Sequence, residues 1–302
     1  MSAPASEAPT MRMSQPGMPE LSLRPGRPED AAAAGRVCYE AFRSIADCHN
    51  FPTDFPSAEV ATGLLAGLLT HPGFSSVVAE LDGQIVGSNF LDERSAIAGV
   101  GPITVDPSVQ DRRIGRQLMQ AVLDRAAARQ FAGVRLLQAA YHTRSFALYT
   151  SLGFRVRGQI ACLQGPPLGI TIAGRAVRPA RETDLETMNR ICRSVHGHDR
   201  GGEVLDAIRA GTAMVVEHGG RISGYATALA FFGHAVGETA DDLKALIGAA
   251  PAFDGPGILV PADSPLLAWC LDNGLRVVQL MTLMSVGLYN EPTGAFLPSV
   301  LF

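Results

Sequence analysis

Apolar residues along the chain repeat with two periods, one typical of helices and one typical of strands. Between residues 113 and 129 they follow helical spacing at Ile114, Leu118, Met119, Val122, Leu123 and Ala126. This stripe predicts an amphipathic helix that packs on a sheet. Shorter apolar runs separated by glycine-containing turns predict strands, as at 76–81 and 84–89.

Applied to the first half of the chain, these two periods predict alternating strands and helices. Strands are expected at 21–24, 76–81, 84–89, 97–105, 134–139 and 154–163, and helices at 29–45, 58–69, 113–129 and 143–152. The early strands pair across short turns, and a strand-helix-strand crossover follows them. We therefore expect an α/β fold of the α+β kind, a mixed, mostly antiparallel sheet flanked by helices.

Three short segments of the first half recur in the same order in the second half. They are Arg-Pro-x-Arg before an aspartate, at 24–30 and 178–184; the hairpins that begin at Val77 and Val215; and SLGFRV and DNGLRV, at Ser151 and Asp272. This order predicts a duplicated domain. The expected organisation is a disordered tail at 1–20, a first domain at 21–165, a Gly/Pro-rich connector at 166–174 and a second domain at 175–302.

Composition restricts the partners. A chain of 302 residues with 47% apolar residues can bury two cores. A formal net charge of −4 without a long Lys/Arg run argues against nucleic acid or an anionic membrane as partner, and no apolar run is long enough to span a bilayer. Five scattered cysteines without a C-x-x-C pair predict reduced thiols, a cytoplasmic location and no metal site.

The segment at 105–119 joins a strand end, a polar turn and a helix start. Free backbone N–H groups and the helix dipole favour an anion there, and Gly115 allows a ligand to approach closely. Arg112, Arg113 and Arg116 add positive charge. The P-loop string and the three-glycine dinucleotide fingerprint are both absent from the sequence, so those two kinds of phosphate site are excluded.

This segment resembles the acyl-CoA loop of the GNAT superfamily of N-acetyltransferases, Gln/Arg-x-x-Gly-x-Gly/Ala. Gln110 takes the first place and Gly115 the last, while Arg113 replaces the first glycine. We expect Arg113 to point out of the turn, because an arginine in the phosphate seat would exclude the cofactor. The segment HTRSFALYTSLGF at 142–154 resembles a second GNAT string, Asn-x-x-Ala-x-x-Leu-Tyr-x-x-x-Gly-Phe, with His142 in place of the asparagine.

The resemblance covers 21–165 and implies acetyl-CoA as co-substrate, without a metal. It assigns cofactor binding to Ile103, Thr104, Val105, Gln110, Asp111, Arg112, Arg113, Ile114, Gly115, Arg116, His142 and Phe146. The second half resembles a degenerate GNAT copy, because GETADDLKALIGAA places acidic residues where phosphate would bind. We expect this half to complete the acceptor pocket or to stabilise the first half.

Two catalytic candidates follow. The resemblance implies Tyr149 as the general acid that protonates the departing thiolate, and the alternative for it is a core aromatic. Glu93, at a strand end, is a candidate base, and the alternative is a solvated hairpin end. His49, Phe51 and Phe55 are candidates for the acceptor pocket, and the alternative is a loop stabilised by its prolines.

The leading hypothesis is transfer of an acetyl group from acetyl-CoA to the primary amine of a small molecule by direct attack. No Ser-His-Asp or reactive-cysteine set in the sequence suggests a covalent intermediate. The alternatives are a non-catalytic acyl-CoA sensor and a protein or peptide N-acetyltransferase. The acceptor, the acyl-chain preference and the oligomeric state are left open by the sequence.

Overall fold

The computed structural model describes residues 21–301, and the tail predicted at 1–20 lies outside them. The first half contains β1 (Leu21–Pro25), α1 (Ala31–His49), α2 (Ala58–Thr70), β2 (Phe74–Leu81), β3 (Gln84–Asp92), β4 (Ile97–Val100), β5 (Thr104–Val105), α3 (Ile114–Ala128), β6 (Gly133–Ala139), α4 (Thr143–Ser151) and β7 (Arg155–Gln164). The second half contains β8 (Arg175–Pro179), α5 (Leu185–His196), α6 (Gly201–Ala210), β9 (Met214–His218), β10 (Arg221–Ala226), β11 (Ala235–Gly237), α7 (Ala240–Ala249), β12 (Ile258–Pro261), α8 (Pro265–Asp272), β13 (Arg276–Gly287) and β14 (Ala295–Leu297).

The strands of the described chain form two sheets. The larger has the order β1-β2-β3-β4-β6-β13-β7-β12, with β5 paired to β3, and the smaller has the order β14-β11-β10-β9-β8. In the larger sheet β4 and β6 run parallel, and the other pairs are antiparallel. The prediction of mixed, mostly antiparallel sheets flanked by helices is confirmed.

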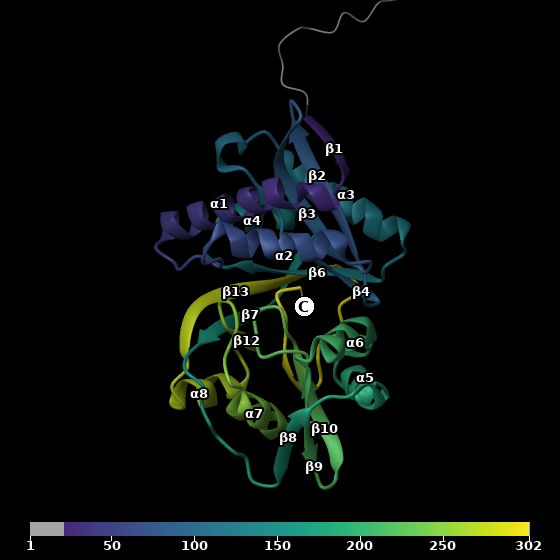
Figure 1. The fold of residues 1–302 in the computed structure, drawn as a ribbon, viewed down its shortest axis with the longest axis vertical. Coiled ribbons are helices and arrows are strands. Elements are labelled where there is room, and N and C mark those ends of the chain that lie inside the picture. The colour runs from purple at the N-terminus through teal and green to yellow at the C-terminus, as the bar shows by residue number, and fades with distance from the viewer. Residues whose placement is uncertain (1–20, 302) are drawn as a thin grey trace, which may run out of the picture.

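Helices cover both faces of the larger sheet in the first half (Figure 1). Neighbouring residues of β3 point to opposite faces, and Phe90 packs in the core under α1 and α2 while Leu91 packs in the core under α3. The predicted stripe of α3 is the buried one: Ile114, Leu118, Met119, Val122 and Ala126 are buried and Leu123 is partly buried.

The larger sheet does not end where the first half of the sequence ends. Strand β13, from the second half, lies between β6 and β7, and β12 pairs with the outer edge of β7. In Figure 1 the yellow β13 accordingly crosses between the upper and lower parts of the molecule. The segments 21–165 and 175–302 therefore share a sheet, which their separation in the sequence did not predict.

The sequence repeat has a physical counterpart in each half. An arginine on the first strand binds an aspartate before the first helix and a glutamate on the next strand: Arg24 with Asp30 and Glu80, and Arg178 with Asp184 and Glu217. The paired arginine holds the pKa of Asp30 and of Asp184 below the usual value. The duplication thus preserves an ion-pair cluster as well as a spacing.

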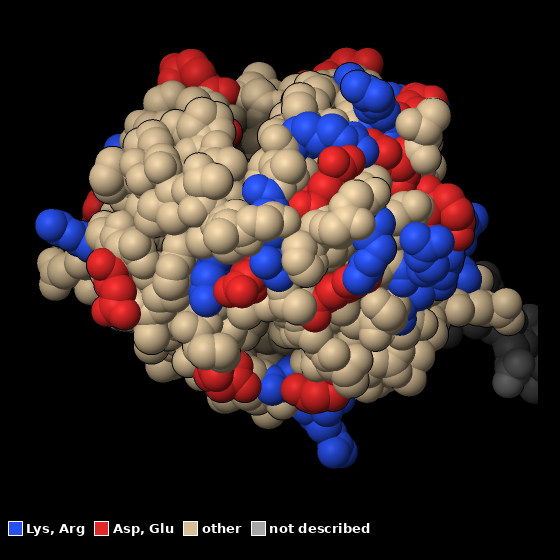
Figure 2. Space-filling view, turned by 90° about the horizontal axis from the view of Figure 1, so that it is seen from below, with Lys and Arg blue, Asp and Glu red and all other residues tan. Residues whose placement is uncertain are grey.

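Seen from the end of the second half, Lys and Arg side chains alternate with Asp and Glu (Figure 2). No broad area of this face of the described chain is covered by basic side chains alone. Within residues 21–301, no helix is both long and apolar enough to cross a membrane.

Candidate active site

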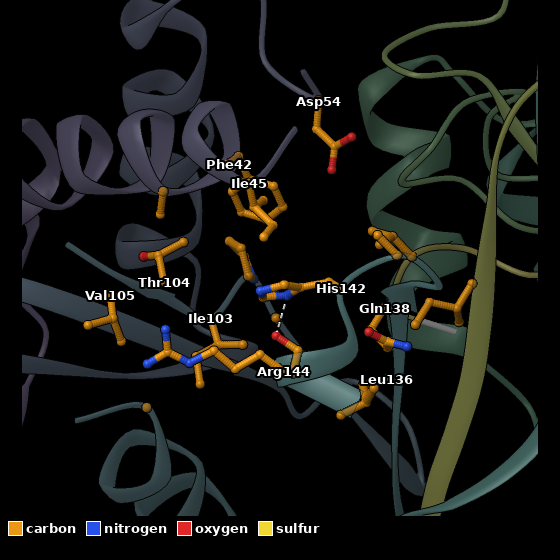
Figure 3. A pocket seen from close by; sticks show the side chains of 18 of the residues that line it. Phe42, Ile45, Asp54, Ile103, Thr104, Val105, Leu136, Gln138, His142 and Arg144 are labelled. Carbon is orange, nitrogen blue, oxygen red and sulfur yellow. Dashed lines mark hydrogen bonds between the residues drawn. The ribbon is translucent and has the colours of Figure 1, made fainter. Parts of the chain in front are cut away.

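A cavity of about 1180 Å³ lies where β4 and β6 diverge. Its walls come from α1 and α2, the segments 100–105, 110–111 and 113–116, the end of β6 with the start of α4, and parts of the second half. Figure 3 shows Ile103, Val105 and Arg144 at one side of this space and Asp54 at the other, next to the second half. The cavity therefore has two ends with different chemistry.

The divergence of the strands follows from their pairing. Strand β4 pairs with β6 from Ile97 to Gly99, whereas β6 continues to Ala139. Pro102 lies between β4 and β5, in neither strand, where a residue without an N–H breaks no ladder. Because β5 pairs within the described residues only with β3, its other edge is free to face the cavity.

The N-terminus of α3 opens into the cavity without a side-chain cap. Arg113 is its N-cap residue and has φ of 61° and ψ of 16°, the left-handed conformation that glycine adopts most easily. Its side chain is exposed and makes no capping hydrogen bond with the first turn. The first-turn N–H groups therefore remain available to an anion.

The loop before α3 is held from α4. The Arg144 guanidinium donates to Gln110 Oε1 at 3.0 Å and to a carboxylate oxygen of Asp111, and Gln110 Nε2 donates to the carbonyl oxygen of Val105 at 3.3 Å. The side chain of Arg144 thus joins the two segments that the sequence singled out separately.

Tyr149 lines the cavity from α4 although it is only 5% exposed. Burial raises its pKa to about 12, partly offset by a hydrogen bond with Ser145. The Ser145 hydroxyl also bonds His142 Nδ1, drawn as the dashed line in Figure 3. Burial, with the charges of His49 and Arg144, lowers the pKa of His142 to about 4, so this ring is neutral at pH 7 and unsuited to act as a strong base.

Residues 72–156 match the family model described as an acetyltransferase (GNAT) domain. This chain contains a GNAT domain. An IAA acetyltransferase of Azospirillum brasilense is 28% identical to the chain over 104 residues, which are 34% of this chain and 68% of that protein. The residues matched by the family model include both motifs, at 110–115 and 142–154.

Two solved structures share the fold across both halves. A putative acetyltransferase from Pyrococcus horikoshii superimposes with a TM-score of 0.69 at 17% identity, covering 95% of each chain. A tandem GNAT protein from the clavulanic acid biosynthesis pathway superimposes with a TM-score of 0.54 at 14% identity, covering 89% of this chain and 98% of the other. The two-domain α/β architecture expected from the sequence is therefore shared with these structures.

Within the GNAT domain, the structure brings together most of the residues predicted to bind the cofactor. All of them line the cavity except Arg112 and Phe146, which lie outside its wall. Phe146 is 36% exposed on α4. The sequence analysis did not predict a role for Arg144, which lies two residues after His142 in the same motif. A cation in a motif that lies beside a phosphate-binding turn could have indicated this role.

Glu93 does not belong to this site. It lies outside the cavity wall, and its carboxylate accepts hydrogen bonds from Arg125 on α3 at 2.7 and 3.0 Å. Arg129 lies 3.8 Å from the same carboxylate. The prediction of Glu93 as the base is corrected for this reason: its charge is paired at the far end of α3.

Of the three residues predicted for the acceptor pocket, two line the cavity and one does not. His49 and Phe55 line the cavity, while Phe51 lies behind the wall and stacks on Tyr141 with ring centres 4.2 Å apart. Tyr141 itself lines the cavity and was not predicted, although it directly precedes His142.

The second half forms part of the cavity wall. It contributes Phe231, Phe232, Gly255, Pro256, Met281, Val300 and Leu301 to the wall. Its own helix α7 begins with a reciprocal cap, in which Asp242 accepts from the backbone N–H and the hydroxyl of Thr239. The aspartate occupies the position that an anionic ligand would need, which agrees with a degenerate second copy.

Gly115 allows a test of the phosphate seat, because the fold itself does not require a glycine there. An added Cβ would lie 3.6 Å from Leu148 and 3.7 Å from Val105, which are ordinary contacts. We expect Gly115→Ala to weaken CoA binding about tenfold without lowering the Tm of the free protein, since the methyl group takes space beside the first-turn N–H groups. Calorimetric titration with CoA measures this.

The matched control is Gly63→Ala on α2, where nothing lies within 4 Å of an added Cβ. Equal CoA affinity in the two variants would mean that no ligand comes close to Gly115.

Proposed function

We propose that this protein is an N-acetyltransferase that transfers the acetyl group of acetyl-CoA to the primary amine of a small molecule by direct attack. One observation carries the proposal: the uncapped N-terminus of α3, the free edge of β5 and the phenol of Tyr149 face the same cavity. An anion site, a carbonyl-polarising edge and a proton donor are the three groups that this reaction needs.

The residues fit the co-substrate. Arg113 and Arg116 are exposed at the rim beside the α3 N-terminus, where they can pair with a pyrophosphate. The free edge of β5 runs from this rim into the cavity and offers backbone groups to an extended chain such as pantetheine. Bound there, acetyl-CoA supplies the thioester that the amine attacks.

Tyr149 acts on the leaving group in this proposal. The attacking nitrogen forms a bond with the carbonyl carbon, the C–S bond breaks, and the thiolate takes a proton from the phenol. With a pKa raised to about 12, the phenol stays protonated at neutral pH and is available as a donor. The Ser145 side chain is hydrogen-bonded to this hydroxyl and also to His142, so it orients the phenol.

The acceptor is proposed to be a small molecule because residues of both halves surround the end of the cavity that receives it. A flexible protein tail would need a groove that continues along the surface. We also propose a cytoplasmic location, since all five cysteines are free thiols.

A thiol-release assay across amines, amino acids and antibiotics tests the function, together with the Tm in the presence of acetyl-CoA. We expect thiol release with at least one amine and a stabilisation of about 2.7 kcal/mol at 100 times the Kd of acetyl-CoA. Stabilisation without any turnover would favour the acyl-CoA sensor. No stabilisation at all would contradict both functions.

A further inference from the structure

We propose that the acceptor end of the cavity takes an apolar primary amine, and that Asp54, positioned by Gln279 from the second half, accepts the proton of its ammonium group. This inference rests on the acetyltransferase proposed above and names the substrate class and the base of the same site.

Asp54 lies in the loop between α1 and α2 and lines the cavity. Gln279, on β13, donates from Nε2 to Asp54 Oδ1 at 3.2 Å. The Gln279 side chain is buried, at 3% exposure, and its Oε1 has no hydrogen-bond partner in the described chain. Because the amide oxygen has no partner there and the amide nitrogen donates to Asp54, the hydrogen bond to the carboxylate fixes the position of the buried Gln279 side chain.

Among residues 21–301, no cationic side chain is paired with the carboxylate of Asp54. The titratable groups that sense this charge are Cys38 on α1, Tyr141 after β6 and Cys162 on β7, and all three are neutral at pH 7. Burial raises the pKa of Asp54 to about 6, against the effect of the Gln279 hydrogen bond. A partly buried carboxylate without a cationic partner, placed in a cavity wall, lowers stability and is a feature of functional sites.

Most of the other side chains at this end are apolar, although His49, Gln138 and Tyr141 also line the cavity. Its wall includes Phe42, Ile45, Phe55, Phe231, Met281 and Leu301. The arginines in the cavity wall, Arg113, Arg116 and Arg144, belong to the cofactor end. Asp54 is thus the carboxylate that an incoming ammonium group meets, while the body of the amine lies against hydrocarbon. A second charge on the amine would have to be buried without a partner.

The reaction then balances. The Asp54 carboxylate takes one proton from the ammonium group, and the neutral nitrogen bonds to the carbonyl carbon. As the C–S bond breaks, the thiolate takes the phenolic proton of Tyr149. The remaining surplus proton on nitrogen restores the phenol, and Asp54 releases its proton to water. The products are the amide, the free thiol of CoA and one proton.

Two amines of equal length test the substrate class. We expect hexylamine to be acetylated with a kcat/KM roughly tenfold or more above that of 1,6-diaminohexane, since the diamine places a second ammonium group against the apolar wall. The same amines, added with CoA, should raise the Tm in the same order. This second measurement does not depend on turnover.

Asp54→Asn tests the base. We expect kcat/KM for hexylamine at pH 7 to fall by about 10²–10⁴-fold. The wild-type rate should rise with pH through about 6 and then level off. The rate of the variant should instead climb about tenfold per pH unit towards the pKa of the amine, because only free neutral amine attacks.

The stability of Asp54→Asn separates this effect from misfolding. The pKa of Asp54 is higher in the folded protein than in the unfolded chain, so its ionisation lowers stability as pH rises from about 4 to 6, and the loss persists above 6. At pH 8 the Tm of Asp54→Asn should therefore equal or exceed that of the wild type. Its stabilisation by acetyl-CoA should be unchanged.

Gln279→Leu tests the positioning role. Loss of the amide donor removes a contact that lowers the pKa of Asp54, so the midpoint of the pH profile should move upward from about 6. Equal rates for the two amines, or a wild-type pH profile in Asp54→Asn, would overturn the inference and leave the acetyltransferase in place. No thiol release with any amine would overturn both.

Discussion

Tyr149→Phe is expected to lower kcat for amine acetylation by about 10²–10⁴-fold. The phenol lines the cavity, and its raised pKa of about 12 keeps it protonated as a donor to the thiolate. The aromatic ring remains in the core formed with Phe154 and Met284, so the variant should lose only the hydrogen bond to Ser145, worth about 1 kcal/mol. Thiol release at saturating amine measures kcat.

The matched control is Tyr39→Phe on α1, which removes the hydroxyl of a partly buried tyrosine outside the cavity wall. Its kcat should stay within about twofold of the wild type, and acetyl-CoA should raise the Tm of both variants. An unchanged kcat in Tyr149→Phe would mean that another group protonates the thiolate and that Tyr149 is a core aromatic.

Met284→Ala is expected to destabilise both halves together by about 2–5 kcal/mol. Met284 belongs to β13 in the second half of the sequence, but it is 0% exposed in the core of the first half, with Leu91 and Tyr149. The single tryptophan, Trp269, packs on the core of the second half. Urea unfolding followed by tryptophan fluorescence and by circular dichroism should therefore shift by the same amount.

Leu280→Ala is the control on the same strand, because Leu280 is 46% exposed and should contribute about 0.5 kcal/mol or less. If Met284→Ala left the Trp269 transition in place and moved only the circular dichroism signal, the halves would unfold independently. That result would contradict a shared sheet as the source of their stability.

The cofactor end was predictable because its chemistry is local. The turn from Gln110 to Gly115 and the first turn of α3 are contiguous in the chain, so a short motif specifies both the backbone and its free N–H groups. The αL conformation of Arg113 also explains why a glycine is usual at that place. The buried stripe of α3 followed from spacing in the same way.

The acceptor end was predictable only in part. Asp54 lies in the loop between α1 and α2, and Glu93 directly follows β3. Nothing in the neighbouring sequence indicates which of the two carboxylates is better placed to act as a base. Packing distinguishes them: Arg125 pairs with Glu93 outside the cavity, whereas Asp54 lies in the cavity wall and accepts a hydrogen bond from Gln279. The residue that positions Asp54 is 225 places away in the chain.

By itself, the sequence determined the local elements, the order of the two motifs and the duplication, because each depends on residues a few places apart. Only the tertiary structure decided that β13 completes the sheet of the first half, that Phe231 and Leu301 belong to the cavity wall, and that Asp54 lines the cavity whereas Glu93 does not. Strand pairing and burial join residues that are distant in the chain. The free energy gained from strand pairing and burial depends on which surfaces come into contact, and a short segment of sequence does not specify its contact partner.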